Sequence, residues 1–198
     1  MKKNLWIVSD EAYEHVLFDG GEHTSIGSLI PAYDKVVSVY SFSKSYAMSG
    51  LRLGYFACRD ELFNDRAGKL LRCTVNGINS VTQWGAIAAL ATPDEWYKNM
   101  NAEYLKRRDL FVEALAGNEI LTPYVPHGAF YLWCKVKDGV DVAKLSEAMA
   151  QAGIGNAPGD CFGEAPSTVQ SIRFAFSCST EMILEGAAPL RAFLKKYH

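Results

Sequence analysis

Two short apolar runs constrain the fold most, because polar residues follow each of them directly. Residues 5–8 (LWIV) lead into SDEAY at 9–13, and residues 36–40 (VVSVY) lead into SFSKS at 41–45. Short apolar runs bounded in this way predict buried strands. In α/β sheets, ligands bind outside the carboxyl ends of the strands. The polar residues after the two runs are therefore expected to meet in one crevice.

Lys44 lies in the second polar segment, residues 41–54 (SFSKSYAMSGLRLG). A lysine that forms a Schiff base with a cofactor aldehyde must be held rigidly and partly desolvated, so that its amine can be neutral. The hydroxyls of Ser41 and Ser43 and the guanidinium of Arg52 are donors suited to a phosphate group. A single lysine taken alone is more often a solvated surface charge, so the indication comes from the whole segment.

Asp10 and Tyr13 follow the first apolar run with the spacing Asp-x-x-Tyr. A carboxylate that faces a pyridine nitrogen keeps this nitrogen protonated, which lets the ring accept electrons from a carbanion. A tyrosine three residues later can reach the phenolic oxygen of the same ring. Taken alone, Asp10 is explained more simply as a helix N-cap after a strand.

Arg173 lies in residues 171–177 (SIRFAFS), which alternate apolar and polar side chains and predict a half-buried strand. A charge on one face of such a strand needs a partner, and a bidentate carboxylate is the partner that arginine binds best. Taken alone, a surface arginine on an edge strand is the simpler explanation.

Together these segments resemble the class I/II (fold type I) pyridoxal-phosphate-dependent aminotransferases. Residues 41–54 resemble the cofactor attachment site of that family. Residues 126–133 (PHGAFYLW) resemble the Gly-x-Phe-Tyr strand of its small domain, and residues 158–163 (PGDCFG) resemble its Pro-Gly-x-x-Phe-Gly turn. The resemblance implies pyridoxal 5'-phosphate as the cofactor, with an amino acid and a 2-oxo acid as substrates.

The resemblance also implies a role for each candidate residue. Lys44 would hold the cofactor as a Schiff base and then shuttle the substrate α-proton as general base and acid. The remaining roles are a partner for the pyridine nitrogen (Asp10), a partner for the phenolic oxygen (Tyr13), phosphate donors (Ser41, Ser43 and Arg52) and a clamp for the substrate α-carboxylate (Arg173).

The expected fold is α/β. The resemblance implies that residues 1–105 form part of a large cofactor-binding domain with a mixed, mostly parallel sheet, and that residues 106–198 form an α+β small domain. The sequence patterns predict strands near 4–9, 35–40 and 54–58, helices near 60–72 and 79–91, a long helix over 93–116, a strand pair within 122–136, a helix at 141–151, a strand at 171–176 and a closing helix at 180–196.

The resemblance covers only the carboxyl half of the family's fold. A part expected before Met1 would hold the glycine-rich turn and the helix N-terminus that supply most of the phosphate donors. We therefore expect a truncated form with weak or no activity alone. Two alternatives stay open, since a fold does not fix its chemistry. One is a β-lyase, racemase or synthase that uses the same cofactor, and the other is a non-catalytic fragment or effector-binding module.

Composition narrows the partners and the compartment. The 198 residues are 49% hydrophobic with a net charge of −2, and contain no bilayer-length apolar run, which favours a soluble protein without nucleic-acid or membrane partners. Five cysteines without Cys-x-x-Cys spacing indicate a reducing compartment, and four scattered histidines give no metal site. Residues 1–4 lack the apolar core of a signal peptide, so a cytoplasmic location is expected.

Two further expectations concern the surface. The family resemblance, together with the small residues and Trp84 in the Ala-rich helix, predicts a homodimer. Burial of Trp84 within one subunit is the alternative. Residues 106–108 (KRR), the only basic cluster, are expected to lie on a solvated helix face.

Overall fold

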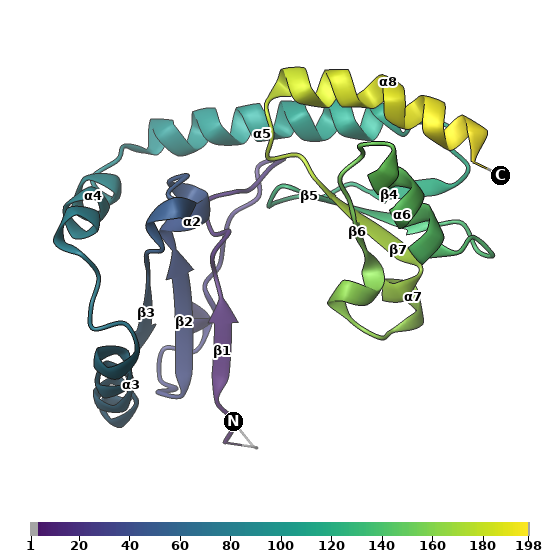
Figure 1. Cartoon of the computed structure of the whole chain (residues 1–198). Coiled ribbons are helices and arrows are strands. Elements are labelled where there is room, and N and C mark those ends of the chain that lie inside the picture. Colours follow the sequence, from purple (N-terminus) through teal and green to yellow (C-terminus); the bar gives the residue numbers. More distant parts are fainter. Residues whose placement is uncertain (1–3, 198) are drawn as a thin grey trace. The chain divides into compact units, whose positions relative to one another are not determined.

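The computed structural model describes residues 4–197, so the expectation about a signal peptide lies largely outside the described residues. The chain divides into two compact units, residues 1–98 and 99–198, and each is described by itself (Figure 1). The division falls within helix α5 (Asp94–Ala114), and so does the predicted domain boundary between residues 105 and 106.

The first unit is built on a three-stranded sheet of mixed direction. Its strands are β1 (Ile7–Asp10), β2 (Val36–Ser41) and β3 (Gly54–Cys58), in the order β1-β2-β3. Strand β1 is parallel to β2, with Asp10 opposite Val39, whereas β3 is antiparallel to β2. The α/β fold class expected from the sequence is confirmed.

Strand β1 differs from the expected buried strand. The side chains of Leu5 and Val8 are 62% and 71% exposed, whereas Val37 of β2 is only 4% exposed. Among the described residues, β1 pairs with β2 alone. The apolar run predicted a strand correctly. Its burial was not predicted correctly, because burial depends on which other elements of the chain pack on the strand.

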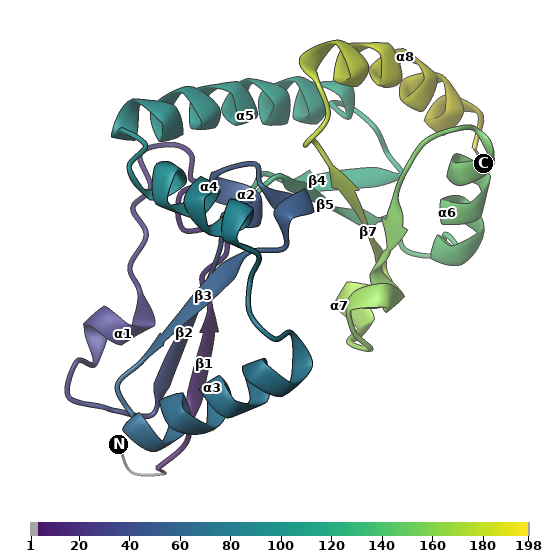
Figure 2. The ribbon, with the colours of Figure 1, turned by 60° about the vertical axis from the view of Figure 1, so that its left-hand side comes forward.

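Helices lie on both faces of this sheet (Figure 2). Helix α1 (Ile26–Leu29) packs against β2. Helix α3 (Glu61–Thr74) is capped at its N-terminus by Asp60, whose carboxylate accepts a hydrogen bond from the Phe63 amide at 2.7 Å. The Phe63 ring then contacts Phe56 of β3 and Trp6, with centroid distances of 5.6 and 5.4 Å. The remaining elements of this unit are α2 (Phe42–Ser45), the 3-10 turn η1 (Ser49–Leu51) and α4 (Ser80–Leu90).

The second unit contains an antiparallel sheet in the order β4-β5-β7-β6. Its strands are β4 (Leu121–Tyr124), β5 (Tyr131–Val136), β6 (Ala157–Pro158) and β7 (Ser171–Ala175). The short elements η2 (Gly159–Phe162) and α7 (Pro166–Val169) lie between β6 and β7. Helix α6 (Val142–Gln151) packs on β6 and β7, and its residues Leu145 and Met149 are fully buried in the core.

Helix α8 (Thr180–Lys196) runs beside the part of α5 that belongs to this unit (Figure 1). The Thr180 hydroxyl donates to the Glu103 carboxylate at 2.6 Å, and Arg191 Nε donates to the Ala114 carbonyl at 3.0 Å. Both pairs are separated by 77 residues, so the two helices run in the same direction.

The expectation for the basic cluster was wrong for Arg108. Its side chain is buried, and its guanidinium donates to the Asp109 carboxylate at 2.9 Å and to the Pro126 carbonyl at 3.0 Å. Lys106 is exposed, as expected. No helix among residues 4–197 combines the length and the apolar character needed to cross a bilayer.

Candidate active site

Lys44 lies in the single helical turn α2, which begins where β2 ends (Figure 1). Ser41 caps this turn, because its hydroxyl oxygen accepts a hydrogen bond from the Ser43 amide at 3.2 Å. The Phe42 amide donates to the Leu53 carbonyl at 3.2 Å, and the Phe42 side chain is only 3% exposed. The turn that carries Lys44 is therefore anchored to the core beside it.

The segment after β1 meets this turn within the same unit. The Glu11 amide donates to the Val39 carbonyl at 2.8 Å, which holds the segment beside the end of β2. Asp10 is exposed and accepts a hydrogen bond from the Ala12 amide at 3.1 Å, so it caps a turn and not a helix. The Lys44 amine lies 5.7 Å from the centre of the Tyr13 ring.

Arg52 closes the loop that follows Lys44. Its backbone has φ 52°, in the left-handed region, and its Nη1 donates to the Ser49 carbonyl at 2.8 Å. The guanidinium is exposed, so its remaining donors can meet a ligand. An amine, hydroxyls, a guanidinium, a carboxylate and a phenol thus come from two short segments, residues 10–13 and 41–52. This set of groups fits pyridoxal phosphate chemically.

Glu11 is a site-proximal residue that the sequence did not single out. Its side chain is buried, and its carboxylate accepts hydrogen bonds at 2.8 Å from His23 Nε2 and from the Ser25 hydroxyl. Burial by itself would raise the pKa of Glu11, but the hydrogen bonds from His23 and Ser25 and from neighbouring hydroxyls outweigh it and lower this pKa. The sequence signal that could have identified Glu11 is its position, as a charged residue just after an apolar strand.

Arg173 lies on β7 in the second unit, between β5 and β6 and not at an edge of the sheet. Its guanidinium carbon lies 4.1 Å from the centre of the Tyr131 ring and 4.2 Å from that of Phe162. Trp133 in turn contacts the Phe162 ring edge-on at 5.5 Å. Contact with two aromatic rings restricts the orientation of the guanidinium, which can offer paired donors to a planar acceptor.

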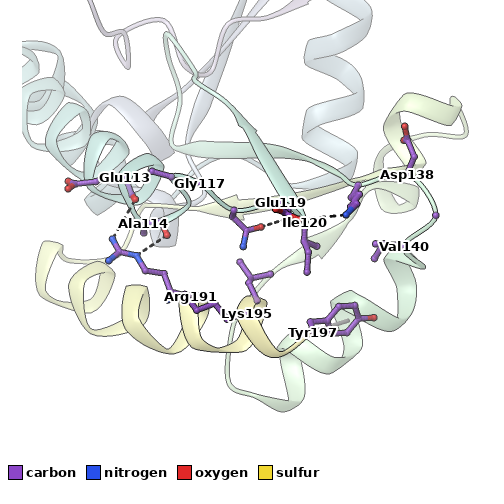
Figure 3. Close-up of a pocket in the computed structure, with 15 residues that line it drawn as sticks. Glu113, Ala114, Gly117, Glu119, Ile120, Asp138, Val140, Arg191, Lys195 and Tyr197 are labelled. Carbon is purple, nitrogen blue, oxygen red and sulfur yellow. Dashed lines mark hydrogen bonds and ion pairs between the residues drawn. The ribbon is translucent and has the colours of Figure 1, made fainter.

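A hollow of about 810 Å³ lies elsewhere in the second unit, near the carboxyl ends of α5 and α8 (Figure 3). It contains none of the predicted site residues. Arg191 is bonded to the Ala114 carbonyl, and Lys137 lies 3.9 Å from the Glu119 carboxylate. Two of the cationic side chains that line this hollow, Arg191 and Lys137, thus already have acceptors within the chain.

Comparisons with known proteins identify the family of the chain. The sequence model of the family described as "Aminotransferase class I and II" matches residues 1–190, so the chain belongs to this family. The chain is 33% identical over 195 residues to the aspartate aminotransferase of Pinus pinaster, covering 90% of this chain and 38% of that protein. It is 32% identical over 204 residues to aromatic-amino-acid aminotransferase 2 of Thermococcus litoralis, covering 99% and 50%.

A solved structure supports the same assignment. The aromatic aminotransferase from Pyrococcus horikoshii OT3 matches with a TM-score of 0.89 and 31% identity, over 98% of this chain and 52% of that one. The chain thus spans about half the length, or less, of the relatives that it matches. Class I/II aminotransferases depend on pyridoxal phosphate, so the cofactor expected from the sequence is confirmed at the level of the family.

Proposed function

We propose that this chain carries the cofactor-attaching lysine of an aminotransferase that moves an amino group between an amino acid and a 2-oxo acid. The observation that carries the proposal is the approach of the Lys44 amine to the Tyr13 ring at 5.7 Å, where the segments after β1 and β2 meet. Family membership supports transaminase chemistry over a β-lyase, racemase or synthase.

Pyridoxal phosphate, when bound, supplies an aldehyde and an electron-withdrawing ring. Lys44 would hold this group through its amine, and the same amine would take and return the proton at the substrate α-carbon. The Asp10 carboxylate would keep the pyridine nitrogen protonated, and the Tyr13 hydroxyl would donate to the phenolic oxygen. Ser41, Ser43 and Arg52 would bind the phosphate.

Arg173 binds the α-carboxylate of the substrate. Relatives of this chain are named for aspartate and for aromatic amino acids. The side chains of these amino acids differ, but all of them carry an α-carboxylate. The contacts of Arg173 with the Tyr131 and Phe162 rings support the role, because a guanidinium whose orientation is restricted loses less conformational freedom when it forms two parallel hydrogen bonds.

The first test is attachment of the cofactor. The 198-residue chain is mixed with excess pyridoxal phosphate, reduced with borohydride, and mapped by peptide mass spectrometry. We expect a visible absorbance band before reduction and a reduced adduct on Lys44. The Lys44→Ala variant should lose both. Lys69→Ala is the matched control, since Lys69 lies exposed on α3 and pairs with Asp65. Equal labelling of the Lys44→Ala and wild-type chains would overturn the proposal.

The second test is turnover. Amino acids are supplied with several 2-oxo acids, and new amino acid is measured. Ammonia or pyruvate released without any acceptor would favour a lyase instead.

Ser41, Ser43 and Arg52 are few donors for a phosphate. We therefore propose that this polypeptide alone binds the cofactor weakly and has weak or no activity. The alternative of a non-catalytic fragment thus stays open for this polypeptide.

We also propose that the protein is a homodimer, as its family resemblance implies. Helix α4 supports this, because Val81, Trp84 and Ile87 are 81%, 72% and 57% exposed. A helix that is apolar around much of its circumference is normally covered.

The cytoplasmic location expected from the sequence stays a prediction.

A further inference from the structure

Two consecutive residues at the start of α5 bind the turn that carries Lys44. The indole Nε1 of Trp96 donates to the Ser45 carbonyl at 2.9 Å, and the Tyr97 hydroxyl donates to the Tyr46 hydroxyl at 2.8 Å. All four residues belong to the first unit. The two residues directly after Lys44 are thus each held by a hydrogen bond from the same helical turn.

Tyr97 also contacts the other segment of the candidate site. Its ring stacks on the ring of His15, with centroids 4.0 Å apart and planes inclined by 19°. His15 lies two residues after Tyr13, whose ring faces the Lys44 amine. One side chain therefore touches both the turn that carries Lys44 and a residue two positions after the proposed ligand Tyr13.

The chemistry of these contacts is specific. Burial and the hydrogen bond to Tyr46 raise the pKa of the Tyr97 hydroxyl, so this hydroxyl stays protonated and remains a donor. Tyr46 itself stacks on Phe42 at 5.0 Å and packs against the core cluster of Phe42, Leu53 and Ala89. The hydrogen bond thus joins Tyr97 to the anchored side of the turn.

We propose that Tyr97, assisted by Trp96, is a positioning residue that fixes the Lys44 turn against the segment of Tyr13 and His15. The inference rests on the proposed function of Lys44. It goes beyond that function, since it assigns to the start of α5 a role in the geometry of the cofactor-attaching amine. If the start of α5 only packed against the turn, the aromatic rings would be enough. The hydrogen bond between the two hydroxyls would then contribute nothing to the position of Lys44.

The experiment uses the full chain and a double-mutant cycle of Tyr97→Phe, Tyr46→Phe and the two combined. Each single variant keeps its ring and loses only the shared bond. We measure the rate at which borohydride fixes pyridoxal phosphate on Lys44, and the hydrogen–deuterium exchange of the peptide covering residues 42–48. Tyr124→Phe is the matched control, because Tyr124 is 58% exposed on β4. Thermal melting checks that every variant is folded.

We expect each single variant to slow fixation on Lys44 about fivefold and to speed exchange of residues 42–48 by a similar factor, as loss of one hydrogen bond predicts. The double variant should lose no more than either single one, because both remove the same bond. Trp96→Phe should act in the same direction. Wild-type fixation and exchange in Tyr97→Phe, or losses that add in the double variant, would overturn the inference.

A failure of the proposed function looks different. If the wild-type chain forms no adduct on Lys44, the role of Lys44 is refuted. The exchange measurement needs no cofactor and still decides whether Tyr97 and Tyr46 jointly hold the turn.

Discussion

The carboxylate of Glu11 and the imidazole of His23 lie 2.8 Å apart, and the carboxylate is almost completely buried. This pair, with Ser25, ties the residue next to Asp10 to the segment that leads into α1. The exposed Asp10 thus has a buried and hydrogen-bonded neighbour. Glu11 fixes the path of the backbone from which Asp10 and Tyr13 extend.

Glu11→Gln should lower the free energy of unfolding by about 1–3 kcal/mol at neutral pH, since a buried charged acceptor is replaced. The pKa of Glu11 is lower in the folded chain than the ordinary value of 4.5. Its contribution to stability is therefore complete above that value and is lost as the pH falls through the lower folded pKa. Denaturant unfolding across acidic to neutral pH should show the two proteins converging in acid. Glu119→Gln, at an exposed glutamate, should match wild type throughout.

Arg173→Lys should weaken binding of a 2-oxo acid at least about tenfold, because lysine keeps the charge but loses the planar pair of donors. Phe162→Leu should weaken this binding less, since the contact of Arg173 with the Tyr131 ring remains. Equilibrium dialysis with a labelled 2-oxo acid measures both variants. Arg66→Lys, at an exposed position of α3, is the control. Unchanged binding by Arg173→Lys would remove Arg173 from the proposed site.

Gly159→Ala should destabilise the chain by about 3 kcal/mol or more. A Cβ atom at Gly159 would overlap the carbonyl oxygen of Thr168 and lie 2.9 Å from that of Ser171, so backbone would have to move. Gly155→Ala is the matched control, because its Cβ would meet no atom within 4 Å. Denaturant unfolding of the two variants should separate them clearly, and equal stabilities would contradict the packing described for η2.

Cys134 should be the last cysteine to react with iodoacetamide. It is fully buried on β5, and burial raises the pKa of its thiol to about 12. Cys73 and Cys161 are exposed and should be alkylated first. Peptide mass spectrometry after short exposures at mildly alkaline pH gives the order. Early modification of Cys134 in the folded chain would show that the second sheet opens readily.

Trp84→Glu should shift the chain toward the monomer if α4 lies in the interface of a homodimer. A charge placed at a covered apolar contact is costly, whereas the same change on a free surface is tolerated. Light scattering at micromolar concentrations should give a mass above 21.9 kDa for wild type and a lower value for the variant. Leu184→Glu on α8, where Leu184 is 55% exposed, controls for the added charge. A wild-type chain that is monomeric throughout would refute the dimer for this polypeptide.

Local pattern was sufficient for most of the secondary structure. The apolar runs predicted β1 and β2, and the helical periodicity predicted α3, α4 and α8 close to their observed bounds. Short elements such as α2 and η1 were not predicted, because a single turn has too few residues to show a period. The order of Asp10, Tyr13 and Lys44 after their strands was also visible, since ligands gather at the carboxyl ends of such strands.

What the sequence could not determine are contacts between residues that are distant along the chain. Trp96 and Tyr97 each bind a residue 51 positions earlier, and nothing in either segment predicts that partner. Arg108 is buried although its neighbours are charged, because the Pro126 carbonyl and Asp109 receive its donors. Strand β1 is apolar yet exposed, because burial depends on which layers cover a strand. Periodicity along the chain determines the elements, and only their packing determines which side chains meet.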